Sequence, residues 1–153
     1  MAEKYAAPFI NSFIGVLPQL GFEDIHKGIT EKIGKIIESP GVMVILGIVG
    51  DIRGNVLYGM SESCAKKIAS TMMMGMEVTE FDAMAQSAVS ELTNMITATA
   101  STELTGQGIK TDISTPTLMY GDFNASASYE NVLRVEMLVG SDPFNIYISL
   151  EEA

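Results

Sequence analysis

The chain has 153 residues, of which 47% are hydrophobic, and its formal net charge at pH 7 is −10. This composition excludes an intrinsically disordered chain, and the length predicts a single domain over residues 1–153 with a sizeable core. The negative charge argues against nucleic acids and anionic membrane surfaces as partners. With one cysteine and no apolar run long enough for a bilayer span, the sequence indicates a cytoplasmic protein without an internal disulfide.

The first half of the chain predicts a helix, an extended segment, a β-hairpin and a second helix. In these segments the apolar residues recur either at helical spacing or at every second position, and glycine or proline residues mark the segment ends. Gly50 and Gly54 fit a hairpin turn better than a phosphate-binding loop, because this segment joins strand to strand. The expected elements are a helix over residues 8–20, a strand over 28–38, hairpin strands over 42–49 and 55–60, and a helix over 62–74 capped by Ser61.

A long helix opens the second half, and the same order of elements follows it. Thr79 and Asp82 form a predicted capping pair, and Gly106 is the expected stop. The buried stripe is expected to comprise Ala85, Ala88, Leu92, Met95, Ile96 and Thr99. The elements expected here are a helix over 81–106, short extended segments over 109–115 and 118–120, a loop over 121–128, and strands over 129–139 and 144–150.

Both halves therefore share the order helix, extended segment, hairpin, which suggests an internal duplication. No linker or low-complexity tract divides the chain. The predicted fold class is α+β: one mostly antiparallel sheet with packed helices, built from two similar helix-strand-hairpin halves.

Three features offer chemistry but lack the partners that such chemistry needs. His26 has no second metal-ligand residue beside it, so a solvated histidine is the simpler interpretation. Cys64 lies in the first turn of a helix, where a thiol can be acidified, but no base accompanies it. The methionines at positions 72, 73, 74 and 76 could line an adaptable surface, although at least two are expected to face the core.

Glu91 and Asn94 lie one turn apart on a second side of the long helix, with Ser87 at the same spacing. No lysine or arginine occurs between Lys67 and Lys110, so the Glu91 carboxylate has no cation near it in sequence. An asparagine amide is both donor and acceptor but takes up no proton, so Asn94 can orient a water molecule without acting as a base. A Glu-x-x-Asn spacing is common in itself, and a solvated helix face is the alternative interpretation.

A longer pattern gives these residues a context. Ser87, Glu91, Asn94 and Pro116 follow the spacing Asp or Ser, three residues, Glu, two residues, Asn, then a proline 22 positions later (116 − 94 = 22). In this pattern and in the segments VMVILGIVGDIRGNVLYGMS, MMMGME, ELTNM and DISTPT, the chain resembles the CheC/CheX/FliY family of response-regulator phosphatases, and most of all its CheX branch. The resemblance covers nearly the whole chain from about Val42 onward.

The resemblance implies hydrolysis of the aspartyl-phosphate on a CheY-like response regulator. In that mechanism Glu91 pairs with the active-site lysine of the receiver, and Asn94 holds a water in line with the phosphorus. Ser87 and Pro116 complete the motif, and no cofactor of the chain's own is needed, because the phosphorylated partner supplies Mg2+. Thr93 stands where the family has a glycine, and beside the docking face its methyl group would restrict which receivers fit.

The resemblance also implies one site per chain and a homodimer whose sheet is continuous between subunits. Two-site relatives repeat the motif on their first helix, where this chain has Asn11 but Pro8 in place of the acid. The alternative function is a non-catalytic dimeric interaction module that binds a receiver domain or a deamidase partner. Asn94 favours the enzyme, because a pure binder has no need of an amide that orients water. The sequence leaves open whether the pathway is chemotaxis or another two-component system.

Overall fold

A computed structural model describes residues 2–153, and Met1 of the expected domain lies outside them. The helices are a short 3-10 helix η1 (Ala2–Tyr5), α1 (Ala6–Gln19), α2 (Glu62–Met72) and α3 (Ala83–Gly106). The strands are β1 (Ile25–Ile33), β2 (Ile36–Glu38), β3 (Val42–Gly50), β4 (Ile52–Met60), β5 (Thr111–Ile113), β6 (Thr117–Tyr120), β7 (Asn124–Ser126), β8 (Val132–Val139) and β9 (Asp142–Glu152).

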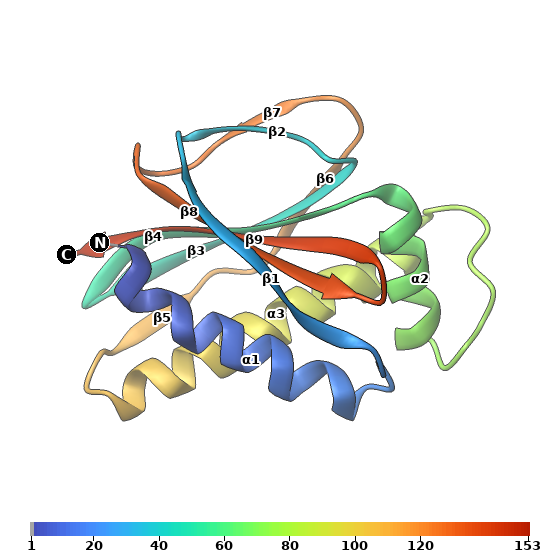
Figure 1. The fold of residues 1–153 in the computed structure, drawn as a ribbon, viewed down its shortest axis with the longest axis horizontal. Coiled ribbons are helices and arrows are strands. Elements are labelled where there is room, and N and C mark those ends of the chain that lie inside the picture. The colour runs from blue at the N-terminus through green and yellow to red at the C-terminus, as the bar shows by residue number, and fades with distance from the viewer. Residues whose placement is uncertain (1) are drawn as a thin grey trace.

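Within the described residues, seven strands form one sheet in the order β1-β8-β9-β4-β3-β5, and β6 pairs with β3 alongside β5. Every neighbouring pair in this sheet is antiparallel. α1 and α3 lie along one face of the sheet, with α2 at one end, and the two-stranded sheet β2-β7 arches over the opposite face (Figure 1). The predicted α+β fold class is confirmed.

The strand exchange between the halves supports the duplicated organisation. β1 from the first half pairs with β8 of the second, and β5 and β6 from the second half pair with β3 of the first. The two hairpins meet at the centre through β4 and β9. Each half therefore contributes one edge to the other half's hairpin.

Two cores form, one on each face of the sheet. The larger lies between the sheet and the helices and includes Phe9, Phe13, Leu17, Val44, Ile96 and Phe144. The smaller lies under β2 and β7 and includes Ile37, Met43, Leu57, Ala125, Val132 and Tyr147. Among the helices described, none combines the length and apolar character that a membrane span requires.

Two expected segments, one strand and one loop, differ from the structure in more than their end residues. The strand predicted over 28–38 is divided, because β1 pairs with β8 in the large sheet whereas β2 pairs with β7 in the small one. The expected loop over 121–128 contains β7, whose short polar sequence Asn-Ala-Ser resembles a turn but pairs along its length with residues 36–38. Both errors arise because pairing partners distant in sequence decide these segments.

The buried face of α3 is broader than its apolar residues predict. Thr99 is exposed although burial was expected, whereas Thr93 and Thr97 are fully buried. The hydroxyl of Thr93 donates to the carbonyl of Ser90 at 2.8 Å, and that of Thr97 donates to the carbonyl of Thr93 at 2.7 Å. These local bonds let threonine enter a core without an unpaired hydroxyl. Thr93 consequently faces the core, and its methyl group lies away from any docking face.

A tyrosine on the sheet fixes the rotation of α3. Tyr58 on β4 is fully buried, and its hydroxyl oxygen lies 2.7 Å from Oγ1 of Thr97. Because the Thr97 proton is donated to the Thr93 carbonyl, the Tyr58 hydroxyl is the donor of this bond. Burial raises the pKa of Tyr58, which keeps the phenol protonated. The sheet thus holds α3 at a point one turn beyond Asn94.

Tyr58→Phe is expected to lower the free energy of unfolding by about 1 kcal/mol, since it removes one buried hydrogen bond while keeping the ring. Denaturant unfolding followed by circular dichroism measures the change. Tyr120→Phe is the matched control, because this half-exposed side chain packs edge-on against Phe81 through its ring. Equal stability of the Tyr58→Phe variant and the parent protein would contradict this account of how α3 is held.

Candidate active site on helix α3

The N-terminus of α3 is set by a single carboxylate. Oδ1 of Asp82 accepts a hydrogen bond from the backbone N–H of Ala85 at 2.9 Å, so Asp82 is the N-cap and the helix begins at Ala83. Thr79 therefore lies outside the cap, and the predicted start at Phe81 was two residues early. The helix ends at Gly106 as expected, and Gly108 adopts the left-handed conformation just beyond it.

Ser87, Glu91 and Asn94 share one outward face of α3. With about 100° per residue, their side chains point within about 60° of one another, and those of Glu91 and Asn94 start about 5–6 Å apart. Ser87 and Glu91 are exposed, and Asn94 is half-buried. Neither Glu91 nor Asn94 has a side-chain hydrogen bond or ion pair with any residue in the described part of the chain.

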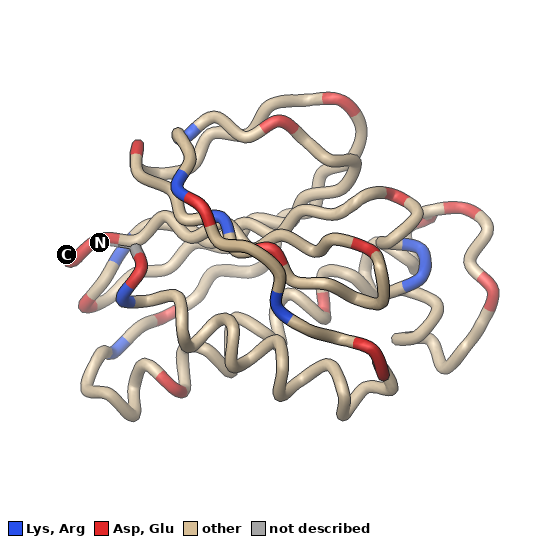
Figure 2. Tube along the Cα trace, viewed as in Figure 1, with Lys and Arg blue, Asp and Glu red and all other residues tan. Residues whose placement is uncertain are grey.

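The charges around this face leave Glu91 uncompensated. Acidic residues and no lysine or arginine mark the connection from α2 to α3 (Figure 2). The lysines on α2 are engaged elsewhere, since Lys66 pairs with Glu62 and Lys67 with Asp142. A free carboxylate beside a free carboxamide can accept an external cation and orient a polar ligand at the same time.

Pro116 is brought to the same region by the edge of the sheet. It lies between β5 and β6, and α3 packs against both strands. Thr111 hydrogen-bonds to Ser101 near the end of α3, whereas Tyr120 packs on Phe81 just before its start. These two contacts bracket Pro116, so it runs beside the middle of α3, the part that carries Glu91 and Asn94.

The other residues with possible chemistry lie elsewhere. Cys64 is 1% exposed, and burial raises the pKa of its thiol to about 12, the opposite of an activated cysteine. His26 is exposed on β1, with Nδ1 3.5 Å from a carboxylate oxygen of Asp24. Across residues 2–153, no three histidine, cysteine or acidic side chains are grouped to hold a metal ion.

The shape of the site favours a macromolecular ligand. A pocket beside Cys64 is lined by Phe22, Lys67 and Asp142 among others, and it includes none of the four motif residues. Three of them, Ser87, Glu91 and Asn94, instead stand on the outer surface of a long helix, which offers no enclosure to a small molecule. A macromolecular partner that has a concave site of its own can bind to such a convex surface.

A family model described as "Chemotaxis phosphatase CheX" matches residues 42–137. Over 95% of this chain and 97% of the relative, the sequence is also 33% identical to the CheY-P phosphatase CheX of Thermotoga maritima. The chain belongs to the CheX family. The matched segment of this CheX-family chain contains all four residues of the motif.

Solved structures agree with this membership. A CheX from Desulfovibrio desulfuricans superposes with a TM-score of 0.86 at 21% identity, covering 97% of this chain and 99% of the other, which shows a shared fold. A CheX from Borrelia burgdorferi, solved in complex with CheY, BeF3 and Mg2+, matches with a TM-score of 0.79 at 26% identity. That match covers 97% of this CheX-family chain and 98% of the other chain.

The first helix shows why the chain carries the motif once. Asn11 on α1 is exposed, and its amide nitrogen lies 3.4 Å from both carboxylate oxygens of Glu103 on α3. Pro8, where an acid would stand three residues earlier, is buried in the first turn. An asparagine already facing an acid of its own chain, with no acid beside it on α1, does not reproduce the free pair on α3.

Proposed function

We propose that this CheX-family chain hydrolyses the aspartyl-phosphate of CheY-like receiver domains. The observation that carries the proposal is the pair of unpartnered side chains, Glu91 and Asn94, on the outward face of α3. The naming of the Thermotoga maritima relative as a CheY-P phosphatase and the CheY complex of the Borrelia burgdorferi relative support the choice of partner.

In the proposed mechanism each side chain has one task. Glu91 forms an ion pair with the active-site lysine of the receiver and aligns the two proteins. Asn94 enters the receiver's site and holds a water in line with the phosphorus, accepting from the water and donating to a phosphoryl oxygen. The Mg2+ that neutralises the phosphoryl group belongs to the receiver. Ser87 and Pro116 form the protein surface on either side of Glu91 and Asn94.

Positioning accounts for the expected acceleration. Phosphoryl transfer needs little covalent participation by the catalyst. An ordered attacking water and electrostatic stabilisation of the transition state therefore supply most of the rate acceleration. Asn94 is suited to this task because it is half-buried on a helix held by Tyr58, which limits the directions its amide can take.

We also propose that the working form is a homodimer joined through an edge of the large sheet. The two edges are β1 on one side and the β5 and β6 segments on the other, where backbone groups can pair with a second sheet. Ile29 on β1 is 58% exposed, which favours the β1 edge. A monomeric mass in light scattering would contradict the dimer.

Loss of phosphate from a phosphorylated CheY-type receiver, in Mg2+ and with or without the protein, tests the function. We expect the protein to accelerate the loss at catalytic, substoichiometric concentrations. Binding of the receiver without acceleration would instead indicate the non-catalytic interaction module with a receiver as its partner. No binding to any receiver would contradict the phosphatase and leave only the module whose partner is a deamidase.

A further inference from the structure

Three methionines between positions 74 and 84 are exposed. Met74 is 96% exposed, Met76 59% and Met84 63%; the first two lie in the connection from α2 to α3 and the third in the first turn of α3, and we call these three the methionine surface. The neighbouring Met72 and Met73 are half-buried and pack against the main core, as expected for at least two of the cluster. The exposed three remain without a role in the fold.

Met84 is aligned with the proposed docking residue. It lies seven residues before Glu91 on α3, and seven residues are nearly two turns, so the two side chains point within about 20° of each other. The distance along the helix axis is about 10 Å. A protein interface of ordinary size, about 800 Å2 on each partner, that is centred on Glu91 and Asn94 reaches this residue.

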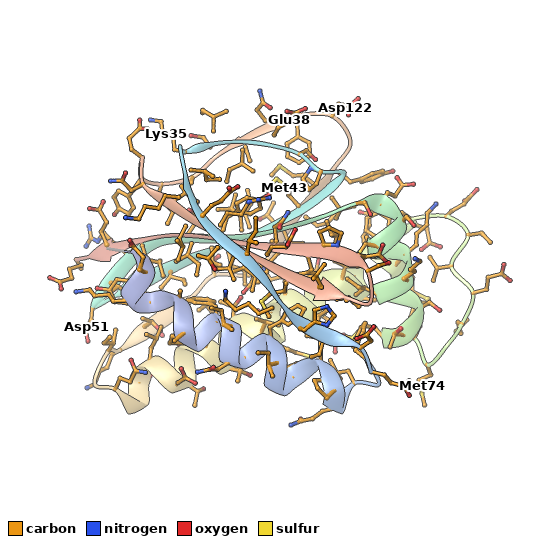
Figure 3. All side chains as sticks on the ribbon, in the orientation of Figure 1. Lys35, Glu38, Met43, Asp51, Met74 and Asp122 are labelled. Atoms are coloured by element: carbon orange, nitrogen blue, oxygen red, sulfur yellow. The ribbon has the colours of Figure 1, made fainter. Side chains whose placement is uncertain are left out.

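Met74 occupies a backbone position that is unfavourable for methionine. It has a φ of +61°, the only positive value at a non-glycine residue within 2–153. The N–H of Gly75 donates to the carbonyl of Ser70 at 2.8 Å and that of Met74 to Thr71 at 3.2 Å, which is the Schellman ending of α2. Glycine is the usual residue at the Met74 position, so a methionine there strains the backbone. Its side chain projects outward (Figure 3) and gains no packing in return.

The charges beside the methionine surface define the partner further. Glu77, Glu80 and Asp82 are exposed in the segment between Met76 and Met84, and no lysine or arginine lies between Lys67 and Lys110 in sequence. The complementary surface is therefore apolar with a basic rim. Methionine side chains are flexible and polarisable, which suits contact with a partner surface of irregular shape.

We propose that the methionine surface is the apolar part of the receiver-binding face and contributes to selecting the receiver. This inference rests on the proposed function and names its occupant: the phosphorylated receiver itself, presenting an apolar patch bordered by lysine or arginine next to its phosphorylated aspartate. Glu91 and Asn94 align and catalyse, whereas Met84 and Met74 hold the partner.

Steady-state kinetics of two variants, Met84→Ser and Met74→Gly, test the proposal. The probes are the CheY proteins of Thermotoga maritima and Borrelia burgdorferi, phosphorylated with acetyl phosphate in Mg2+, and the one turned over faster serves as substrate. Each variant is expected to raise KM about fivefold, the effect of truncating an apolar interface anchor, and to leave kcat within about twofold. Met74→Gly is also expected to raise the midpoint of denaturant unfolding, because glycine relieves the strain.

Val49→Ser is the matched control, since Val49 is 60% exposed on β3 opposite Asp112 of β5. It should change neither KM nor kcat. The dissociation constant for the same CheY loaded with beryllofluoride is measured in parallel and should follow KM. Asn94→Ala should retain this binding while losing turnover, which separates a failure of the proposed function from a failure of this inference.

An unchanged KM and dissociation constant in either methionine variant would overturn the proposal. So would a loss of kcat at unchanged KM, because the residues would then act on the chemistry. A changed oligomeric mass of Met84→Ser in light scattering would show that the surface meets a second copy of the chain instead. Absence of binding between the parent protein and both receivers would overturn the inference together with the proposed function.

Discussion

Replacing Asn94 by alanine is expected to reduce receiver dephosphorylation at saturating receiver about 100-fold or more, to the receiver's own rate. The alanine side chain can neither accept from the attacking water nor donate to a phosphoryl oxygen. The fold should persist, because Asn94 has no side-chain hydrogen bond within the described residues. Phosphate release from a phosphorylated CheY-type receiver measures the rate, and circular dichroism checks the fold.

Asn11→Ala is the matched control for this experiment. It makes the same change on α1, where the amide faces Glu103 at 3.4 Å, and should leave turnover unchanged. Asn94→Asp adds a test of the amide itself, since a carboxylate keeps the size but loses the donor and adds a charge. Turnover that survives in Asn94→Ala, or falls equally in Asn11→Ala, would refute a water-orienting role.

Removing the charge of Glu91 is the change with the second largest expected effect. Glu91→Ala is expected to raise KM for the phosphorylated receiver about tenfold, because an ion pair that loses water on docking contributes more than an exposed one. Glu91→Lys should raise KM further through repulsion of the receiver lysine. Saturating receiver should restore most of kcat, since Asn94 and the water are intact. Titration of receiver in a steady-state assay separates KM from kcat.

The salt dependence of KM gives an independent measure of the same contact. The parent protein should bind the receiver less tightly as ionic strength rises, and Glu91→Ala should show a weaker dependence. Glu103→Ala is the control, because Glu103 lies on the same helix, 12 residues away and about 120° around its axis. An equal rise of KM in both variants would attribute the effect to overall charge and exclude a specific pair.

The candidate site could be located from sequence because its residues are close along one helix. Glu91 and Asn94 are three positions apart, so helical geometry alone puts them on one face. Pro116 was tied to them by motif spacing, and the structure supplies the physical reason. Its segment runs back along α3 between the contacts of Thr111 with Ser101 and of Tyr120 with Phe81.

The errors in the predicted fold come from contacts between distant parts of the chain. Alternating apolar residues gave one strand over 28–38, but β2 leaves the large sheet to pair with residues that resemble a turn. Apolar spacing does not identify Thr93 and Thr97 as core residues, because the threonine side chain carries a polar hydroxyl group. Their hydroxyls bond to helix carbonyls and to Tyr58, a partner that no local pattern reveals.

The place of β9 in the large sheet has a consequence for how the domain folds. β9 is the last of these strands in sequence, yet it lies between β8 and β4 near the centre of the large sheet. Without it, β1 and β8 on one side and β4 and β3 on the other have no strand to join them. The two parts of the sheet therefore join only when β9 pairs on both sides, and its pairing with β4 links residues distant in sequence, which slows folding.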